Sequence, residues 1–104
     1  MYGTIVRLTA RAGGRSAIEA EMERQLAEES VPGHLGTFVY RSDRDPDEYF
    51  VSVVFESREA YRANADSPEQ AARYRRLRAL LAVDPEWHDG EVVDGASRLA
   101  VSQG

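Results

Sequence analysis

The sequence predicts a small α+β fold in which a four-stranded antiparallel sheet carries helices on one face. The segment Glu48–Phe55 consists mostly of β-branched and aromatic residues and is apolar at both alternating positions, which is typical of a strand covered on both faces. Segments with helix-capping signals precede and follow this strand. At 104 residues, the chain has the length of one domain.

The N-terminal segment predicts a strand followed by a helix. Residues along Gly3–Ala10 alternate between two faces, as in a strand. Ser16 followed by Glu19 matches a capping box, which predicts the start of a helix. The apolar stripe of this helix recurs at four-residue spacing: Ile18, Met22 and Leu26. We expect the helix to extend to about Glu29.

The next two strands are predicted to form a hairpin. The helix ends at Val31–Gly33, and His34–Arg41 is rich in residues that favour strands. The polar loop Ser42–Asp47 contains Pro46, a turn signal, and leads directly into Glu48–Phe55.

Two helices are expected after the hairpin. Ser57 can cap a short helix that ends near Ala65. Ser67 then lies at a cap position with Pro68 at the first helical position, which predicts a longer helix to about Ala82. In this helix the arginines from Arg73 onward are expected to lie mostly on a solvated face, with Glu69 four residues before Arg73.

The last strand, Trp87–Val93, completes the order β-α-β-β-α-β, which is the ferredoxin-like pattern. We expect residues 2–93 to form this domain and residues 94–104 to form a C-terminal tail. Both helices of such a fold lie on one face of the sheet, so the other face stays open. Because Glu48–Phe55 is apolar on both faces, we expect a second copy to cover it, giving a homodimeric α+β barrel.

Composition excludes several classes of function. The chain has no cysteine, which removes disulfides and thiolate chemistry. Its net charge of −5 argues against nucleic acid as a partner, since nonspecific affinity for phosphates comes from Lys and Arg. It lacks a Gly-rich dinucleotide fingerprint, a spacing of metal ligands, a secretory leader and an apolar stretch of membrane-spanning length. We therefore expect a cytoplasmic protein that uses no cofactor and no metal.

A resemblance to a known family rests on two stretches of the chain: YGTIVRL near the N-terminus, and FESREAYRANADSPEQAARYRRLRALLAVDPEWHDGEVV. Residues 2–93 resemble the antibiotic-biosynthesis monooxygenase-like family of dimeric α+β barrels. The resemblance implies that a small electron-rich aromatic, phenolic or of the hydroquinone type, is oxidised by O₂ without flavin, haem or metal. Such a reaction needs an apolar, dry pocket with a base and a few hydrogen-bond donors.

A haem-degrading branch of the same superfamily carries a histidine ligand on its second long helix and an asparagine on its first strand. Here Pro68–Ala82 contains no histidine, and the first strand has Arg7 but no asparagine. The resemblance therefore does not extend to haem.

His34 and His88 are the candidate bases, since imidazole is the side-chain type that titrates near neutral pH without perturbation. The alternative is that both are strand-end residues with ordinary hydrogen bonds. Trp87 could stack on an aromatic substrate, although packing in the core or in a dimer interface is the more frequent role of such a residue.

Further candidates for substrate binding are Tyr74, Asn64 and Arg78. The tyrosines that could donate phenolic protons into a cavity are Tyr40, Tyr49, Tyr61 and Tyr74, and Tyr74 is the best placed because its helical stripe faces the sheet. Asn64 can orient a ligand or terminate the short helix, and termination is the simpler role. Arg78 is the arginine nearest the Tyr74 stripe.

Two functions remain open on the sequence alone. One is the cofactor-independent monooxygenase that the resemblance implies. The other is a noncatalytic dimeric protein of the same fold that binds a small ligand or assists another protein. The second is compatible with the lack of a nucleophile–base pair and of paired carboxylates at an interpretable spacing.

Overall fold

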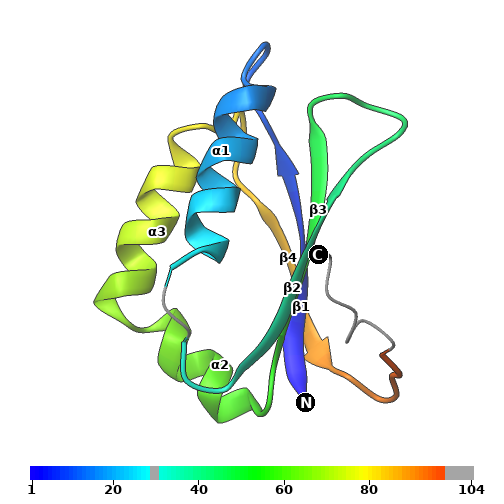
Figure 1. The fold of residues 1–104 in the computed structure, drawn as a ribbon, viewed down its shortest axis with the longest axis vertical. Helices are drawn as coiled ribbons and strands as arrows, with labels where there is room; N and C mark the ends of the chain where they lie inside the picture. The colour runs from blue at the N-terminus through cyan, green and yellow to red at the C-terminus, as the bar shows by residue number, and fades with distance from the viewer. Residues whose placement is uncertain (29–30, 98–104) are drawn as a thin grey trace.

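The computed structural model describes residues 1–28 and 31–97, and Figure 1 shows their arrangement. The elements, in chain order, are β1 (Tyr2–Thr9), α1 (Arg15–Leu26), β2 (His34–Arg41), β3 (Glu48–Phe55), α2 (Arg58–Ala65), α3 (Pro68–Arg78) and β4 (Glu86–Glu91). The predicted ferredoxin-like order is confirmed, with the second helical segment divided into α2 and α3. Among these residues, no helix is long and apolar enough to cross a membrane.

The four strands form one antiparallel sheet in the order β2-β3-β1-β4. The first strand therefore lies in the interior of the sheet, between β3 and β4. All the helices lie on the same side of the sheet (Figure 1), as the sequence predicted. Alternation along β1 turns its even-numbered residues toward the helices and its odd-numbered residues toward the open face.

The hydrophobic core fills part of the space between sheet and helices. Its buried residues come from the sheet, from α1 and from the segment after α3: Val6, Leu8, Ala10, Ile18, Met22, Tyr49, Val51 and Leu81. Leu81 is held there by backbone pairing with Ala10 and by the hydrogen bond from Ala82 N to Thr9 O. The core therefore ties the end of the helical layer to the end of β1.

The expected capping box at the first helix is wrong. Helix α1 begins at Arg15 with Gly14 at the cap position and has no side-chain cap, so Ser16 lies inside the helix. Glu19 instead accepts hydrogen bonds from Arg41 and from Tyr49, and these partners hold its pKa at about 2. The helix ends at Leu26, and the expected end at Glu29 lies outside the described residues.

The predicted starts of α2 and α3 are confirmed. Ser57 accepts a hydrogen bond from Ala60 N, and Ser67 accepts one from Gln70 N. Each side-chain oxygen thereby satisfies a backbone N–H that has no partner within its helix. Pro68 follows Ser67 in the first turn, where its missing N–H has no consequence.

The arginines of α3 do more than cover a solvated surface. Arg73 binds Glu28 at 2.8 Å, and Arg76 binds both Glu21 and Glu28, all on α1 or directly after it. The expected pairing of Arg73 with Glu69 is replaced by this bridge between helices. These ion pairs hold α1 and α3 side by side above the sheet.

Candidate functional site

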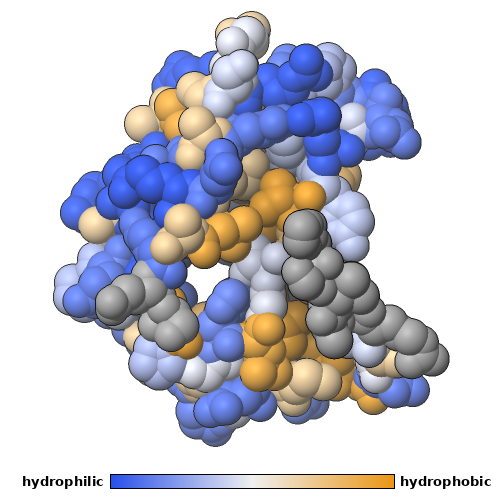
Figure 2. Space-filling model, viewed as in Figure 1, coloured by the Kyte–Doolittle hydropathy of each residue, from blue (hydrophilic) through white to orange (hydrophobic). Residues whose placement is uncertain are grey.

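A cavity of about 620 Å³ lies between the helices and the sheet. Its floor is the helix-facing side of the four strands, and its walls come from α1, α2 and α3. The space-filling view in Figure 2 shows apolar side chains around a hollow between these two layers. A cavity of this volume, mostly apolar and with a few polar groups, has the properties of a site for a small organic molecule.

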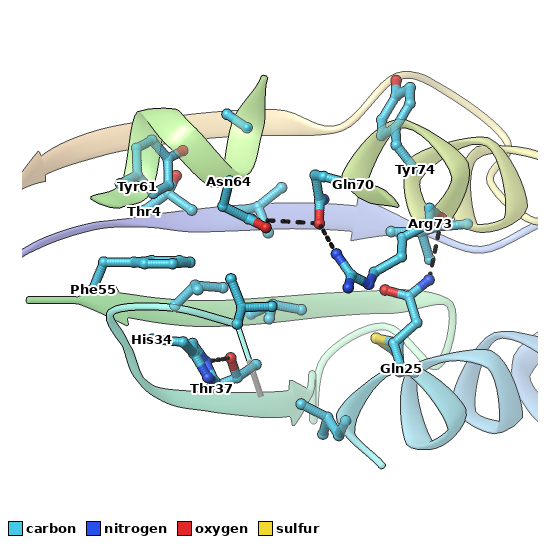
Figure 3. A pocket seen from close by; sticks show the side chains of 18 of the residues that line it. Thr4, Gln25, His34, Thr37, Phe55, Tyr61, Asn64, Gln70, Arg73 and Tyr74 are labelled. Carbon is cyan, nitrogen blue, oxygen red and sulfur yellow. Dashed lines mark hydrogen bonds between the residues drawn. The ribbon is translucent and has the colours of Figure 1, made fainter. Parts of the chain in front are cut away.

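His34 is one of the polar groups of this cavity (Figure 3). It opens β2 directly after Gly33, whose φ of 80° forms the turn out of the preceding loop. Its Nε2 atom lies 2.7 Å from Thr37 Oγ1, and its ring packs edge-on against Phe55 at 5.5 Å. These two contacts fix the orientation of the imidazole.

Asn64 lies in the cavity wall near the end of α2. Its side-chain N–H donates to Gln70 Oε1 at 3.5 Å, which also accepts a hydrogen bond from Arg73 at 3.1 Å. Gln25 reaches the same chain by donating to the backbone oxygen of Arg73 (Figure 3). The result is a line of amide and guanidinium groups that are held in place by one another.

The guanidinium of Arg73 has a negatively charged partner at this wall. Arg73 also binds Glu28, and the guanidinium holds the pKa of that carboxyl below its usual range. Glu28 therefore stays ionised and the positive charge of Arg73 is compensated. Among the described residues, this wall presents oriented hydrogen-bonding groups together with a compensated Arg73–Glu28 ion pair.

Another group of cavity residues consists of Tyr61, one turn before Asn64 on α2, with Asp89 and Thr4 from the sheet. The hydroxyl of Tyr61 donates to Asp89 Oδ1 at 3.0 Å. Burial, followed by this carboxylate, raises the pKa of Tyr61 to about 12. The phenol consequently keeps its proton at neutral pH and cannot act as a base. Thr4 lies beside Tyr61 in Figure 3.

The aromatic candidates Tyr74 and Trp87 both line the cavity. Their ring centroids are 6.5 Å apart, with planes inclined at 41°. Trp87 is 47% exposed in the single chain, so it is not part of the core, and its packing in a dimer interface stays a prediction. The pair forms an aromatic rim on which a flat ligand could stack.

Two of the sequence candidates lie outside the cavity. His88 follows Trp87 on β4 and lies on the open face of the sheet, where it pairs with Ile5 and is 68% exposed. Arg78 binds Asp84 at 2.9 Å and the backbone oxygen of Leu81, so it is directed to the chain after α3. The structure brings together His34, Asn64, Tyr74 and Trp87 but not these two.

Sequence reasoning missed several polar groups of the cavity. Thr4, Thr37 and Asp89 lie in one row across the sheet, although they belong to three different strands. Only the alternation of β1 gave a signal, since it placed Thr4 on the same face as the apolar residues. The positions of Thr37 and Asp89 depend on the register between strands, which the sequence did not reveal.

The assembled site offers a candidate base, hydrogen-bond donors and an aromatic rim around an apolar space. Within the described part of the chain, no group of three acidic or histidine residues is arranged to hold a metal ion. A base, hydrogen-bond donors and an apolar space are the groups that binding and deprotonation of a small organic acid require.

Comparisons with family models and with solved structures point to the same family. The model of the antibiotic biosynthesis monooxygenase family matches residues 1–76. A solved structure assigned to this family, from Chloroflexus aurantiacus, is 30% identical, with 92% of this chain and 96% of the other covered and a TM-score of 0.77. No curated protein sequence matches the chain significantly.

Two further structures are similar in fold. SnoaB, a cofactor-independent oxygenase from Streptomyces nogalater, is 20% identical over 90% of this chain and 94% of its own, with a TM-score of 0.79. A Deinococcus radiodurans protein assigned to the same family is 15% identical, with 93% of this chain and 97% of the other covered and a TM-score of 0.79. The chain has a monooxygenase-type fold and belongs to the antibiotic biosynthesis monooxygenase family.

Proposed function

We propose that the protein is a cofactor-independent monooxygenase that oxidises a phenolic or hydroquinone-type aromatic with O₂. The observation that carries the proposal is the apolar cavity of about 620 Å³ with His34 fixed at its edge. Family membership supports the reaction type, and the similarity in fold to SnoaB supports chemistry without a cofactor.

His34 is the proposed base. Because the Thr37 hydroxyl can both donate and accept, it is compatible with either imidazole tautomer. When Nε2–H donates to Thr37, Nδ1 keeps the lone pair that a base requires. Removal of the phenolic proton then delocalises negative charge onto the ring, which prepares a ring carbon for reaction with O₂.

The remaining steps need little further chemistry from the protein. O₂ adds at a ring carbon that carries hydrogen, and the resulting hydroperoxide loses water to leave a quinone carbonyl. One oxygen atom enters the product, and the electrons that reduce the other to water come from the ring. Asn64 and Gln70 would hydrogen-bond to the oxygen atoms as charge develops on them. The apolar walls would surround the reactive carbanion and limit its contact with water.

Oxygen uptake by metal-stripped protein with a panel of naphthols and hydroquinones tests this function. We expect uptake above the rate without protein, and a fall of about 100-fold or more in His34→Ala, because a general base contributes at least that factor. His88→Ala is the matched control, since its imidazole lies on the opposite face of the sheet. Undiminished uptake in His34→Ala would contradict the assignment of the base. Binding without any uptake would instead identify a noncatalytic binding protein.

We further propose that the open face of the sheet is covered by a second copy of the chain. Ile5 and Phe38 are 54% and 45% exposed on this face, in a row shared with His88. An exposed apolar sheet face is a common site of protein–protein association. Sedimentation should give twice the monomer mass of 11.6 kDa, and Ile5→Glu should give the monomer. A monomeric wild-type protein at micromolar concentration would exclude the dimer.

A further inference from the structure

The side chain of Thr4 lines the cavity but has no use in the base chemistry described above, and its buried hydroxyl has no hydrogen-bond partner among the described residues. Thr4 is 5% exposed and lines the cavity from β1. Its Oγ1 atom is buried and makes no hydrogen bond to any of the described residues. An unpaired buried hydroxyl is unfavourable, so its retention here needs an explanation.

The nearest hydroxyl does not pair with Thr4 in this arrangement. The Tyr61 oxygen lies near enough for the Thr4 hydroxyl to lower the pKa of Tyr61 as a minor effect. Its lone pairs could accept from Thr4, but the two hydroxyls do not have the geometry of a hydrogen bond, and the Tyr61 proton is directed to Asp89. Burial and Asp89 outweigh that effect and keep Tyr61 protonated. This part of the cavity lining therefore holds a Thr4 hydroxyl without a hydrogen bond, beside a tyrosine oxygen and a carboxylate.

The register of the strands shows where Thr4 and Asp89 lie relative to His34, the proposed base. Thr37, Val53, Thr4 and Asp89 are directly paired neighbours across β2, β3, β1 and β4. Adjacent strands are about 4.8 Å apart, so Thr37 and Thr4 are separated by roughly 10 Å. The floor thus carries one polar position under His34, an apolar position at Val53, and a second polar position at Thr4.

We propose that Thr4, together with the Tyr61–Asp89 pair, forms a second polar subsite that takes a hydroxyl group of the ligand. The preferred ligand is then a neutral aromatic with hydroxyl groups at two opposite edges, one at His34 and one at Thr4, with its ring over Val53. The inference rests on the proposed use of the cavity as the substrate site, and it specifies the substrate class.

The chemistry of the subsite favours a hydroxyl over other groups. A ligand hydroxyl can accept from Thr4 and donate to Thr4, Tyr61 or Asp89, whereas an ether at the same place can only accept. A carboxylate there would be repelled by Asp89. The subsite therefore discriminates both by hydrogen bonding and by charge.

Binding measured by calorimetry under argon tests the subsite without any turnover. The probes are β-naphthol, a dihydroxynaphthalene with its hydroxyls on opposite rings, the monomethyl ether of that compound, and a hydroxynaphthoic acid. Wild-type protein should bind the dihydroxy compound about tenfold more tightly than β-naphthol or the ether, as expected for one additional hydrogen bond in a buried site. The acid should bind most weakly.

Thr4→Val removes the hydroxyl with little change of shape and should abolish the tenfold preference, measured within the variant as the ratio of its affinities for the dihydroxy compound and for β-naphthol. Thr4→Ser keeps a hydroxyl and should retain the preference. Thr9→Val, on the opposite face of the same strand, is the matched control. Retention of the preference in Thr4→Val, or its absence in the wild type, would overturn the subsite. If the preference holds and no probe supports oxygen uptake, the subsite stands and the proposed reaction fails.

Discussion

The turn before His34 can be tested by the single substitution Gly33→Ala. Gly33 has a φ of 80°, a region that residues with a side chain rarely adopt. A Cβ atom at this position would lie 2.6 Å from Cβ of Ala60, on α2. The backbone oxygen of Gly33 also accepts a hydrogen bond from Glu56 N at 2.8 Å, so the turn cannot move freely.

Two terms determine the expected loss of stability. Placing an L-residue in the left-handed region costs about 1–2 kcal/mol. Forcing a methyl group into space already occupied by another costs about 1–3 kcal/mol. We therefore expect Gly33→Ala to reduce the free energy of unfolding by roughly 2–5 kcal/mol, a large part of the stability of a small domain.

Gly13→Ala separates the two terms. Gly13 has nearly the same φ, 74°, but a Cβ atom there would meet no heavy atom within 4 Å. Its loss should be only the backbone term of about 1–2 kcal/mol. Combining Gly33→Ala with Ala60→Gly, which removes the atom in conflict, should recover about 1–3 kcal/mol relative to the sum of the two single changes.

Urea unfolding of the four variants and the wild type provides the measurement. Equal losses for Gly33→Ala and Gly13→Ala, with no coupling to Ala60→Gly, would refute the steric argument. Because His34 follows Gly33 directly, Gly33→Ala should also weaken the binding of naphthols, whereas Gly13→Ala should leave it unchanged.

Three further predictions concern the stability of the fold. Ser67→Ala should lower the free energy of unfolding by about 1 kcal/mol through loss of the α3 cap, whereas Ser16→Ala, inside α1, should not lower it. Leu81→Ala should lower the free energy of unfolding by about 2–5 kcal/mol because Leu81 is fully buried. Val83→Ala, at an exposed position, should lower it far less, and thermal unfolding of the two variants measures the difference. Arg7 lowers the pKa of Glu48 from 4.5 to about 2, so ionised Glu48 stabilises the fold above pH 4.5 and this contribution disappears as the pH falls toward 2. Glu48→Gln should therefore be less stable than the wild type at pH 7, with a difference that shrinks over that interval in urea titrations; a difference independent of pH would contradict the ion pair.

Local signals in the sequence account for most of the fold. Alternation along the strands, the Gly33 turn and the caps at Ser57 and Ser67 are each determined by neighbouring residues, and the structure contains all of them. The cap predicted at Ser16 is wrong because the helix already begins at Arg15 with Gly14 at the cap position, and because Glu19 is bound by residues distant in the chain.

The site depends on register, which is not a local property. Trp87 and His88 are consecutive, and the sequence could not tell which of them faces the helices, since a shift of one residue exchanges the two faces. Pairing of β1 with β4 places Trp87 and Asp89 on the cavity side and His88 on the other. The same pairing brings Asp89 next to Thr4, from the opposite end of the chain.

The central claim is that the ligand occupies the cavity between the sheet and the helices, and methyl NMR tests it most directly. The chain has one tryptophan and two methionines, of which Trp87 and Met22 line the cavity and Met1 does not. Ile5 reports on the open face of the sheet. On titration with β-naphthol under argon, the Trp87 indole and Met22 methyl signals should shift, while those of Met1 and Ile5 should stay in place. Shifts at Ile5 without shifts at Met22 and Trp87 would contradict the account.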